Sequence, residues 1–296
     1  MDTMPDATAG EWLKPLLDTV WHDMHSVVPR GFPAYARIFH PVTRDRPQGT
    51  GTWHGHPRMG VVALEEQQVR WSDIARTFGT KMHPLAQFHR LIGQEMSEQE
   101  IMDSEGWRYS EPETGNLAPD TLAAVAAWLC EHTSTPDDGV SAIWEGWGGL
   151  TSSAGYAMLT FSDDGRVLKD TSPLSTGEVG PGSGLLPAEV VNGEKLELPG
   201  RAYYLYKCAP QFYRQQSWVN QVPWHHSAQF PQSPSILWPA DRSWAMVTEI
   251  DFDSTLVAGS HELVLDLVQD PAIEALPLNE GADLTWDADI LNRPGQ

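Results

Sequence analysis

The chain has 296 residues, of which 41% are hydrophobic and 9% aromatic, so it can form one large core or two ordinary ones and is not a disordered chain. Its 19 basic and 40 acidic side chains give a formal net charge of −21. That charge disfavours binding to nucleic acid and to anionic membranes, and it suits a basic protein partner or a cationic small molecule.

The first half of the chain carries most of the predicted helices. Apolar residues recur at three- and four-residue steps between Glu11 and His25, which is typical of a helix with one buried face. A strand at Tyr35–Phe39 lies between two prolines, and a polar, Gly-rich stretch over residues 42–58 is predicted to be a loop. Capping residues and apolar spacing predict three further helices, at residues 72–78, at residues 84–91 and from Pro119 onward.

The second half carries most of the predicted strands. Residues 162–200 hold many Gly and Pro and are interpreted as a long excursion and as the domain boundary. Ser260 is a good N-cap for a helix at His261–Val268. The acidic tail after Gly281 is expected to be frayed except where Trp286 and Leu291 tie it down. The predicted strands are Val140–Trp144, Ala202–Tyr206, Ala245–Phe252 and Ile273–Leu278.

These patterns predict an α+β fold with a helix-rich N-terminal half and a strand-rich C-terminal half around a mixed or antiparallel sheet. A doubly wound parallel sheet is disfavoured because strands and helices do not alternate. The expected parts are a helix-rich region 1–160, a Gly/Pro-rich excursion 161–200 and a strand-rich region 201–296, and the chain can also be a single domain.

Two features bear on the cellular compartment. Cys130 and Cys208 lack metal-binding or redox spacing, and whether they pair is open. The N-terminus is acidic where a signal peptide is basic, and no segment approaches the ~18 consecutive apolar residues of a membrane-spanning helix. We therefore expect a cytoplasmic protein.

Clustered acids suggest a candidate catalytic site. Glu249, Asp251 and Asp253 alternate along a predicted strand, so they would share one face and raise one another's pKa. In a paired-carboxylate hydrolase, one acid donates a proton and another activates water or attacks the substrate. Glu145, between two indoles, could likewise have a raised pKa and act as an acid. The alternative for the three acids is the solvated outer face of an edge strand.

Tryptophan is unusually frequent, with 13 residues against 8 Phe and 7 Tyr. Trp144 and Trp147 flank Glu145 in a Gly-rich turn, where they could hold a cation or stack on a sugar. Trp224 is the third candidate ligand-binding aromatic. The alternative is that these indoles pack in the core.

His54 and His56 are the candidate metal ligands. On an extended segment, two histidines two positions apart place both imidazoles on one side, as a Zn²⁺ site requires. No H-E-x-x-H or Cys/His spacing accompanies them, and solvated loop histidines are the alternative. Phosphate-loop, dinucleotide-binding and nucleophile-elbow motifs are absent, so no cofactor is predicted.

Several segments together resemble a group of hypothetical actinobacterial proteins. The resemblance spans most of the chain and implies a bacterial cytosolic source and a shared fold, with no activity or site residue attached. The segments that carry it are Pro33–Pro41, Ala142–Gly148, Trp238–Trp244, Thr248–Thr255 and Gly259–Ser260.

Two functions follow from these patterns. The first is a binding or accessory module that recognises a basic protein or a small molecule, with no nucleic acid or membrane partner. The alternative is a hydrolase that uses Glu145, Glu249, Asp251 or Asp253, with or without a metal held by histidines. An enzyme would bring these groups into one pocket, whereas a binding module would leave them scattered.

Overall fold

The computed structural model divides the chain into two compact units, which are described separately. Unit 1 comprises Met1–His40, Glu113–Gly155 and Glu178–Thr285, and unit 2 comprises Pro41–Pro112, Tyr156–Gly177 and Trp286–Gln296. The structure describes residues 1–57, 62–93, 100–151, 160–161, 167–168, 184–224 and 232–293.

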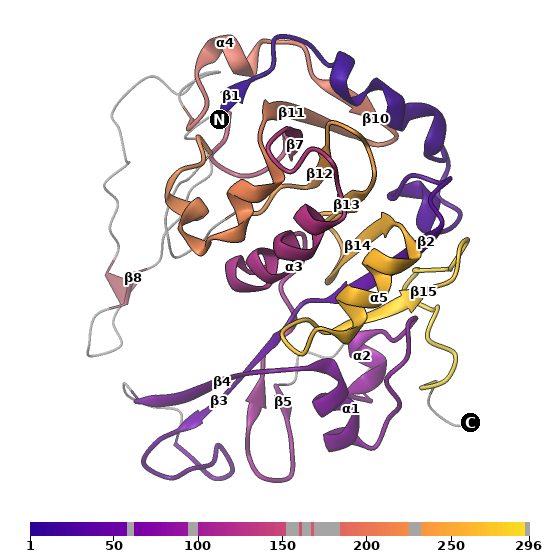
Figure 1. The fold of residues 1–296 in the computed structure, drawn as a ribbon. Coiled ribbons are helices and arrows are strands. Elements are labelled where there is room, and N and C mark those ends of the chain that lie inside the picture. The colour runs from indigo at the N-terminus through magenta and orange to yellow at the C-terminus, as the bar shows by residue number, and fades with distance from the viewer. Residues whose placement is uncertain are drawn as a thin grey trace. The chain divides into compact units, whose positions relative to one another are not determined.

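Unit 1 is built on a nine-stranded sheet with the order β1-β11-β7-β12-β13-β14-β2-β15, in which β10 also pairs with β11 (Figure 1). Every pair in it is antiparallel. The strands are β1 (Asp2–Thr3), β2 (Ala34–Phe39), β7 (Gly139–Trp144), β10 (Leu196–Leu198), β11 (Arg201–Lys207), β12 (Ile236–Pro239), β13 (Ala245–Val247), β14 (Ser254–Gly259) and β15 (Ala275–Leu278).

Helices in unit 1 are short. The longest, α3, has Pro at its first position and an apolar stripe, and Ser260 caps α5 by accepting a hydrogen bond from the Leu263 N–H at 3.1 Å. The helices are η1 (Thr8–Leu16), η2 (Met24–Ser26), α3 (Pro119–Glu131), α4 (Ala188–Val191), η3 (Pro210–Arg214), η4 (Gln216–Asn220) and α5 (His261–Gln269).

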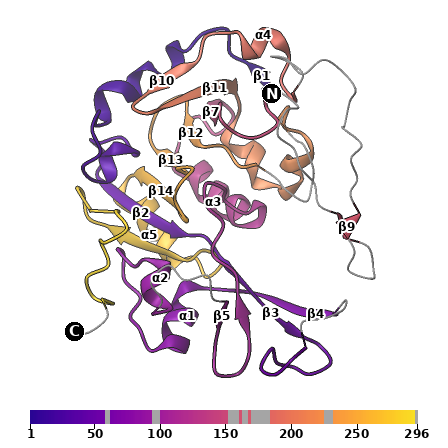
Figure 2. The ribbon, with the colours of Figure 1, turned by 180° about the vertical axis from the view of Figure 1, so that it is seen from behind.

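One face of this sheet is covered by α3 and α5, as Figures 1 and 2 show from opposite sides. Because alternate residues of a strand point to opposite faces, Ile38, Ile143, Met246 and Val257 lie together on this side. They pack against the apolar stripes of the two helices in a single buried cluster. We call this side, defined by these four residues, the helix face.

The opposite side of the sheet carries Tyr203, Ile236, Trp238 and Val247, and we call it the cleft face. The start of the chain covers part of it. Trp12 of η1 meets Trp238 edge-on, with ring centroids 6.1 Å apart. Regular helices thus cover the helix face, whereas irregular chain covers part of the cleft face.

Unit 2 contains a four-stranded antiparallel sheet, in the order β4-β3-β6-β5, with two helices and a separate two-stranded sheet. Arg44 and Arg46 of β3 stack on Trp107, with 4.2 and 4.0 Å from guanidinium carbon to ring centroid. The elements are β3 (Val42–Pro47), β4 (Leu64–Val69), α1 (Trp71–Phe78), α2 (Phe88–Leu91), β5 (Ile101–Met102), β6 (Arg108–Tyr109), β8 (Thr160–Phe161) and β9 (Val167–Leu168).

The predicted division into a helix-rich N-terminal half and a strand-rich C-terminal half is wrong. Strands β1 to β7 all begin before residue 150, and the described residues are strand-rich throughout. The predicted loop over 42–58 contains β3, whose side chains do not alternate between apolar and polar. Instead Arg46 pairs with Glu65 of β4 at 2.8 Å and Arg44 donates to Gln67, so polar cross-strand pairs take the place of an apolar face.

The predicted helix at Glu11–His25 is also wrong. The chain forms the 3₁₀ helix η1, which contains Pro15, and then only the single turn η2. A proline inside a helix removes one backbone hydrogen bond and clashes with the preceding turn, so the apolar spacing cannot be realised as an α-helix. This break frees residues 17–27 to build one wall of the cleft described below.

Other sequence predictions fare better. The strand at Tyr35–Phe39 and the helices at 72–78 and from Pro119 are confirmed. The strands Val140–Trp144 and Ala202–Tyr206 and the capped helix after Ser260 are confirmed as well. The helix predicted at 84–91 is reduced to Phe88–Leu91. The boundaries predicted at residues 160 and 200 stay a prediction, because half of 161–200 lies outside the described residues.

The C-terminal segment of unit 2 is anchored rather than frayed. Asp289 is fully buried and accepts hydrogen bonds from the Gln87 N–H and from Asn292, and its Oδ1 lies 2.8 Å from His83 Nε2. Of the two expected apolar anchors, Trp286 stacks on His89 with ring centroids 3.7 Å apart, whereas Leu291 is exposed. Among the described residues, no helix is long and apolar enough to cross a membrane.

Candidate functional site

Unit 1 contains a cleft of about 240 Å³ on the cleft face of its sheet. It combines an apolar lining with a few polar groups, as small-molecule sites do, and its volume lies just below the roughly 300–1,000 Å³ typical of drug-sized ligands. Its lining residues are Leu17, Asp18, Thr19, Trp21, Ser26, Val27, Leu198, Pro199, Gly200, Arg201, Tyr203, Ile236, Val247 and Glu249.

The floor of the cleft is the sheet itself. Ile236 pairs with Val247 across β12 and β13, and Tyr203 lies further along the same face on β11. Tyr203 is 5% exposed, and its hydroxyl has no hydrogen-bond partner within the described part of the chain. Burial, and then the nearby carboxylate of Glu249, raise the pKa of this phenol above its ordinary value, so the group is neutral at physiological pH.

Arg201 organises the polar end of the cleft. Its Nη2 lies 2.8 Å from Glu249 Oε1 and 2.7 Å from Asp251 Oδ2, so one guanidinium nitrogen serves two carboxylates. Glu249 is 8% exposed. Its second oxygen, Oε2, makes no hydrogen bond or ion pair with the residues that the structure describes. The polar end therefore offers one free carboxylate oxygen beside the free Tyr203 hydroxyl.

The second wall is the segment Leu17–Val27, which we call the wall segment. Its ends are tied by backbone hydrogen bonds, from Asp18 N–H to His25 O at 2.9 Å and from Arg30 N–H to Leu16 O at 3.0 Å. Such paired closures hold an irregular segment in one conformation although it lacks regular secondary structure.

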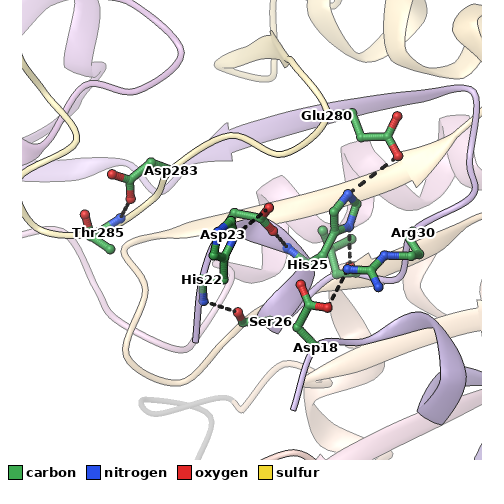
Figure 3. A network of polar contacts seen from close by, with 10 residues as sticks. Asp18, His22, Asp23, His25, Ser26, Arg30, Glu280, Asp283 and Thr285 are labelled. Atoms are coloured by element: carbon green, nitrogen blue, oxygen red, sulfur yellow. Dashed lines mark hydrogen bonds and ion pairs between the residues drawn. The ribbon is translucent and has the colours of Figure 1, made fainter. Parts of the chain in front are cut away.

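Side chains reinforce the wall segment, as Figure 3 shows. Asp18 faces the cleft and forms an ion pair with Arg30 at 2.6 Å. The other contacts of this network include His22 N–H to Ser26 Oγ at 3.0 Å, His25 N–H to Asp23 Oδ1 at 2.7 Å and His25 Nε2 with Glu280 Oε1 at 3.7 Å.

Trp21 stands on the wall segment and remains 46% exposed. It meets Phe252 edge-on, with ring centroids 5.8 Å apart. An indole half open to solvent that also lines a cleft is available to a ligand without any rearrangement of the core.

The structure separates the three acids predicted to share a strand face. Strand β13 ends at Val247, so residues 248–253 form the connection to β14 and do not alternate as in a strand. Glu249 and Asp251 still meet, because both bind Arg201. Asp253 instead lies 3.3 Å from the buried Arg37, and burial raises the pKa of Asp253 above its ordinary value.

The residues predicted around the Trp-Glu-Gly-Trp turn lie outside the cleft lining. Glu145 forms an ion pair with Lys195. Trp144 pairs with Tyr203 across β7 and β11, and its ring lies 5.7 Å from the Arg201 guanidinium carbon. Trp147 meets Trp144 edge-on.

Trp224, the third predicted aromatic, is buried in the core of unit 1. Its Nε1–H donates to Gln232 O at 3.0 Å, and its ring lies 4.9 Å from that of Tyr206. This environment is the core packing that the sequence left as the alternative.

The predicted metal ligands lie in a turn of unit 2. His54 Nε2 lies 2.9 Å from the carbonyl oxygen of Asp103, whereas His56 packs edge-on against Trp53. In the described ranges, no group of three or more His, Cys, Asp or Glu side chains has the arrangement of a metal site. His225 and His226 lie outside the described residues.

Sequence reasoning missed Asp18, Trp21, Arg201 and Tyr203 as members of one site. The first two lie in a segment predicted to be helical. Tyr203 lies in the predicted strand Ala202–Tyr206, and Arg201 directly precedes that strand. Comparisons with protein-family models, with curated proteins and with solved structures found no match. The geometry of the cleft therefore carries the functional argument.

Proposed function

We propose that the protein is a small-molecule-binding module and that its ligand occupies the cleft of unit 1. The observation that supports this is a pair of polar groups, the Tyr203 hydroxyl and Glu249 Oε2, on two side chains that are more than nine-tenths buried. Neither group has a partner in the described chain. Each of these two atoms keeps some accessible surface although its side chain is largely buried, so a ligand in the cleft can hydrogen-bond to both.

The carboxylate hydrolase stays a prediction. Each predicted acid contacts a cation: Glu249 and Asp251 share Arg201, Asp253 contacts Arg37 and Glu145 contacts Lys195. A bacterial source and a cytoplasmic location accompany the binding proposal as predictions.

A fragment screen by two-dimensional ¹H–¹⁵N NMR on the full chain tests this proposal. We expect some fragments to shift amide signals of residues in the cleft lining, and Thr19→Trp to abolish those shifts by filling the mouth. Thr19 is exposed and lines the cleft, so this change leaves the core intact.

Thr114→Trp is the matched control. Thr114 is also exposed in unit 1 but is not part of the lining, and this variant should bind as the wild type does. A screen in which no fragment shifts the cleft signals, or in which Thr19→Trp binds normally, would contradict the proposal.

A further inference from the structure

The charges around the cleft indicate what kind of ligand fits it. We propose that the ligand presents a protonated amine, which donates hydrogen bonds to Glu249 Oε2 and to the Tyr203 hydroxyl. This inference rests on the proposed binding function and adds the chemical class of the head group.

The polar end of the cleft carries more negative than positive charge. The single cation Arg201 lies between the two carboxylates of Glu249 and Asp251, so the three groups together carry one net negative charge. On the wall, Asp18 is matched one to one by Arg30. One negative charge is therefore left at the polar end. Of the two carboxylates, that of Asp251 is exposed, so the attraction for a cation is stronger at the largely buried Glu249.

The hydrogen-bonding capacity of Glu249 and Tyr203 also favours a ligand with an amine head group. A carboxylate oxygen can only accept, so Glu249 Oε2 requires a donor from the ligand. The Tyr203 hydroxyl is held neutral because burial and the nearby Glu249 carboxylate raise its pKa, and its oxygen can accept a second hydrogen bond from the ligand. An ammonium group has three N–H donors and satisfies both at once, with hydrogen bonds that its charge strengthens.

An anionic ligand is disfavoured by the way in which Arg201 is used. Its Nη2 is occupied by the two carboxylates, and its Nη1 donates to Gly200 O at 3.3 Å. Its Nε has no partner in the described chain, but it is fully buried and a ligand cannot reach it. A ligand carboxylate would therefore be repelled by the carboxylates of Glu249 and Asp18, whereas the Nη atoms of Arg201 already donate hydrogen bonds.

The rest of the cleft fits an apolar body of modest size. Leu17, Val27 and Leu198 line it, and Trp21 offers an exposed indole face at which a cation or an aromatic ring can pack. An amine with a short aliphatic or aromatic tail matches both the volume and this division between a polar end and apolar walls.

Three probes of one shape test the head group: phenethylamine, 2-phenylethanol and phenylacetate, titrated into the ¹⁵N-labelled full chain at neutral pH. The amine should bind about ten- to a hundredfold more tightly than the alcohol, the range expected for hydrogen bonds to a charged group, and phenylacetate should bind most weakly. Glu249→Gln should remove most of the preference for the amine and change the affinity for the alcohol by less than about twofold.

Glu145→Gln is the matched control, because it removes one carboxylate from unit 1 outside the cleft lining. It should keep the preference for the amine. If Glu249→Gln does not fold, Tyr203→Phe takes its place and should weaken the amine severalfold, through one lost hydrogen bond, while leaving the alcohol within about twofold.

The two proposals fail in different ways. If fragments bind in the cleft but the amine and the alcohol bind equally, or if Glu249→Gln keeps the preference, the amine inference is overturned and the binding function stands. If neither these probes nor the fragment screen shift any cleft signal, both proposals are overturned.

Discussion

Two tyrosines on opposite sides of the nine-stranded sheet differ in how their hydroxyls are bonded. On the helix face, the hydroxyl of Tyr213 lies 2.8 Å from Ser141 Oγ, and both residues are fully buried. On the cleft face, the hydroxyl of Tyr203 has no partner in the described chain. The Tyr213 hydroxyl is thus bonded within the protein, whereas that of Tyr203 is left to the cavity. The helix face is not satisfied throughout, because the Tyr206 hydroxyl on that side is buried without a partner in the described chain.

This difference separates the parts of the molecule that maintain the fold from the part available for binding. Two regular helices cover the helix face with apolar stripes, and their side chains form one buried cluster with those of the sheet. The cleft face is covered in part by a 3₁₀ helix and the wall segment, and the cavity lies between the wall segment and the sheet. Substitutions on the helix face should therefore cost more stability than similar substitutions on the cleft face.

The largest expected difference is between two tryptophans. Trp244 is fully buried on the helix face and donates its Nε1–H to Leu129 O at 2.8 Å, so Trp244→Ala should lower the free energy of unfolding by about 3–5 kcal/mol. Trp21→Ala at the cleft should cost less than about 1 kcal/mol. Urea unfolding followed by circular dichroism measures both. Similar losses for the two would show that the wall segment is packed as tightly as the core.

A second prediction concerns pH and a histidine on the helix face. Burial lowers the pKa of His40 from 6.5 to about 4, although its hydrogen bond to Glu113 O opposes the shift. As the pH falls from 6.5 to 4, the unfolded chain takes up a proton that the folded chain does not. This histidine's contribution to stability is therefore fully present above pH 6.5, declines by about 3 kcal/mol down to pH 4 and changes little below it.

Urea unfolding at pH 7 and at pH 4.5 tests this dependence. His40→Gln should remove most of the decline that this residue causes. His261→Gln, which changes an exposed histidine at the start of α5, should keep it. An identical pH profile in wild type and His40→Gln would contradict the assignment.

The smallest effect compares the two tyrosines directly. Tyr213→Phe leaves the Ser141 hydroxyl without this partner in a fully buried position and should cost about 1–3 kcal/mol. Tyr203→Phe removes a hydroxyl with no partner in the described chain and should change stability by less than about 0.5 kcal/mol. A large loss on Tyr203→Phe would show that its hydroxyl already has a structural partner.

Local signals in the sequence predicted individual helices and strands better than they predicted how these elements pack together. Ser260 and Pro119 fix helix starts through local hydrogen bonding and a preset backbone angle, and both helices are where we expected them. The charged strand β3 could not be predicted in this way, because its partners Glu65 and Gln67 become visible only when β4 pairs with it.

The site shows the same limit. Glu249 and Asp251 lie close together, as predicted, but not because they alternate along a strand. They meet at Arg201, which lies about fifty residues away in sequence. Tyr203 lies in a strand that was predicted correctly, Ala202–Tyr206. Alternation shows which residues share a face, but which face helices cover depends on contacts distant in sequence.

The pairing of β2 also affects how the chain is made. Its two neighbours, β14 and β15, begin at Ser254 and Ala275, more than two hundred residues after β2 ends at Phe39. At about 5–20 residues per second, β2 leaves the ribosome on the order of 10–40 s before its first partner strand exists. Throughout that time both of its edges are unpaired, so the nascent chain offers chaperones a long-lived binding site that the finished protein no longer has.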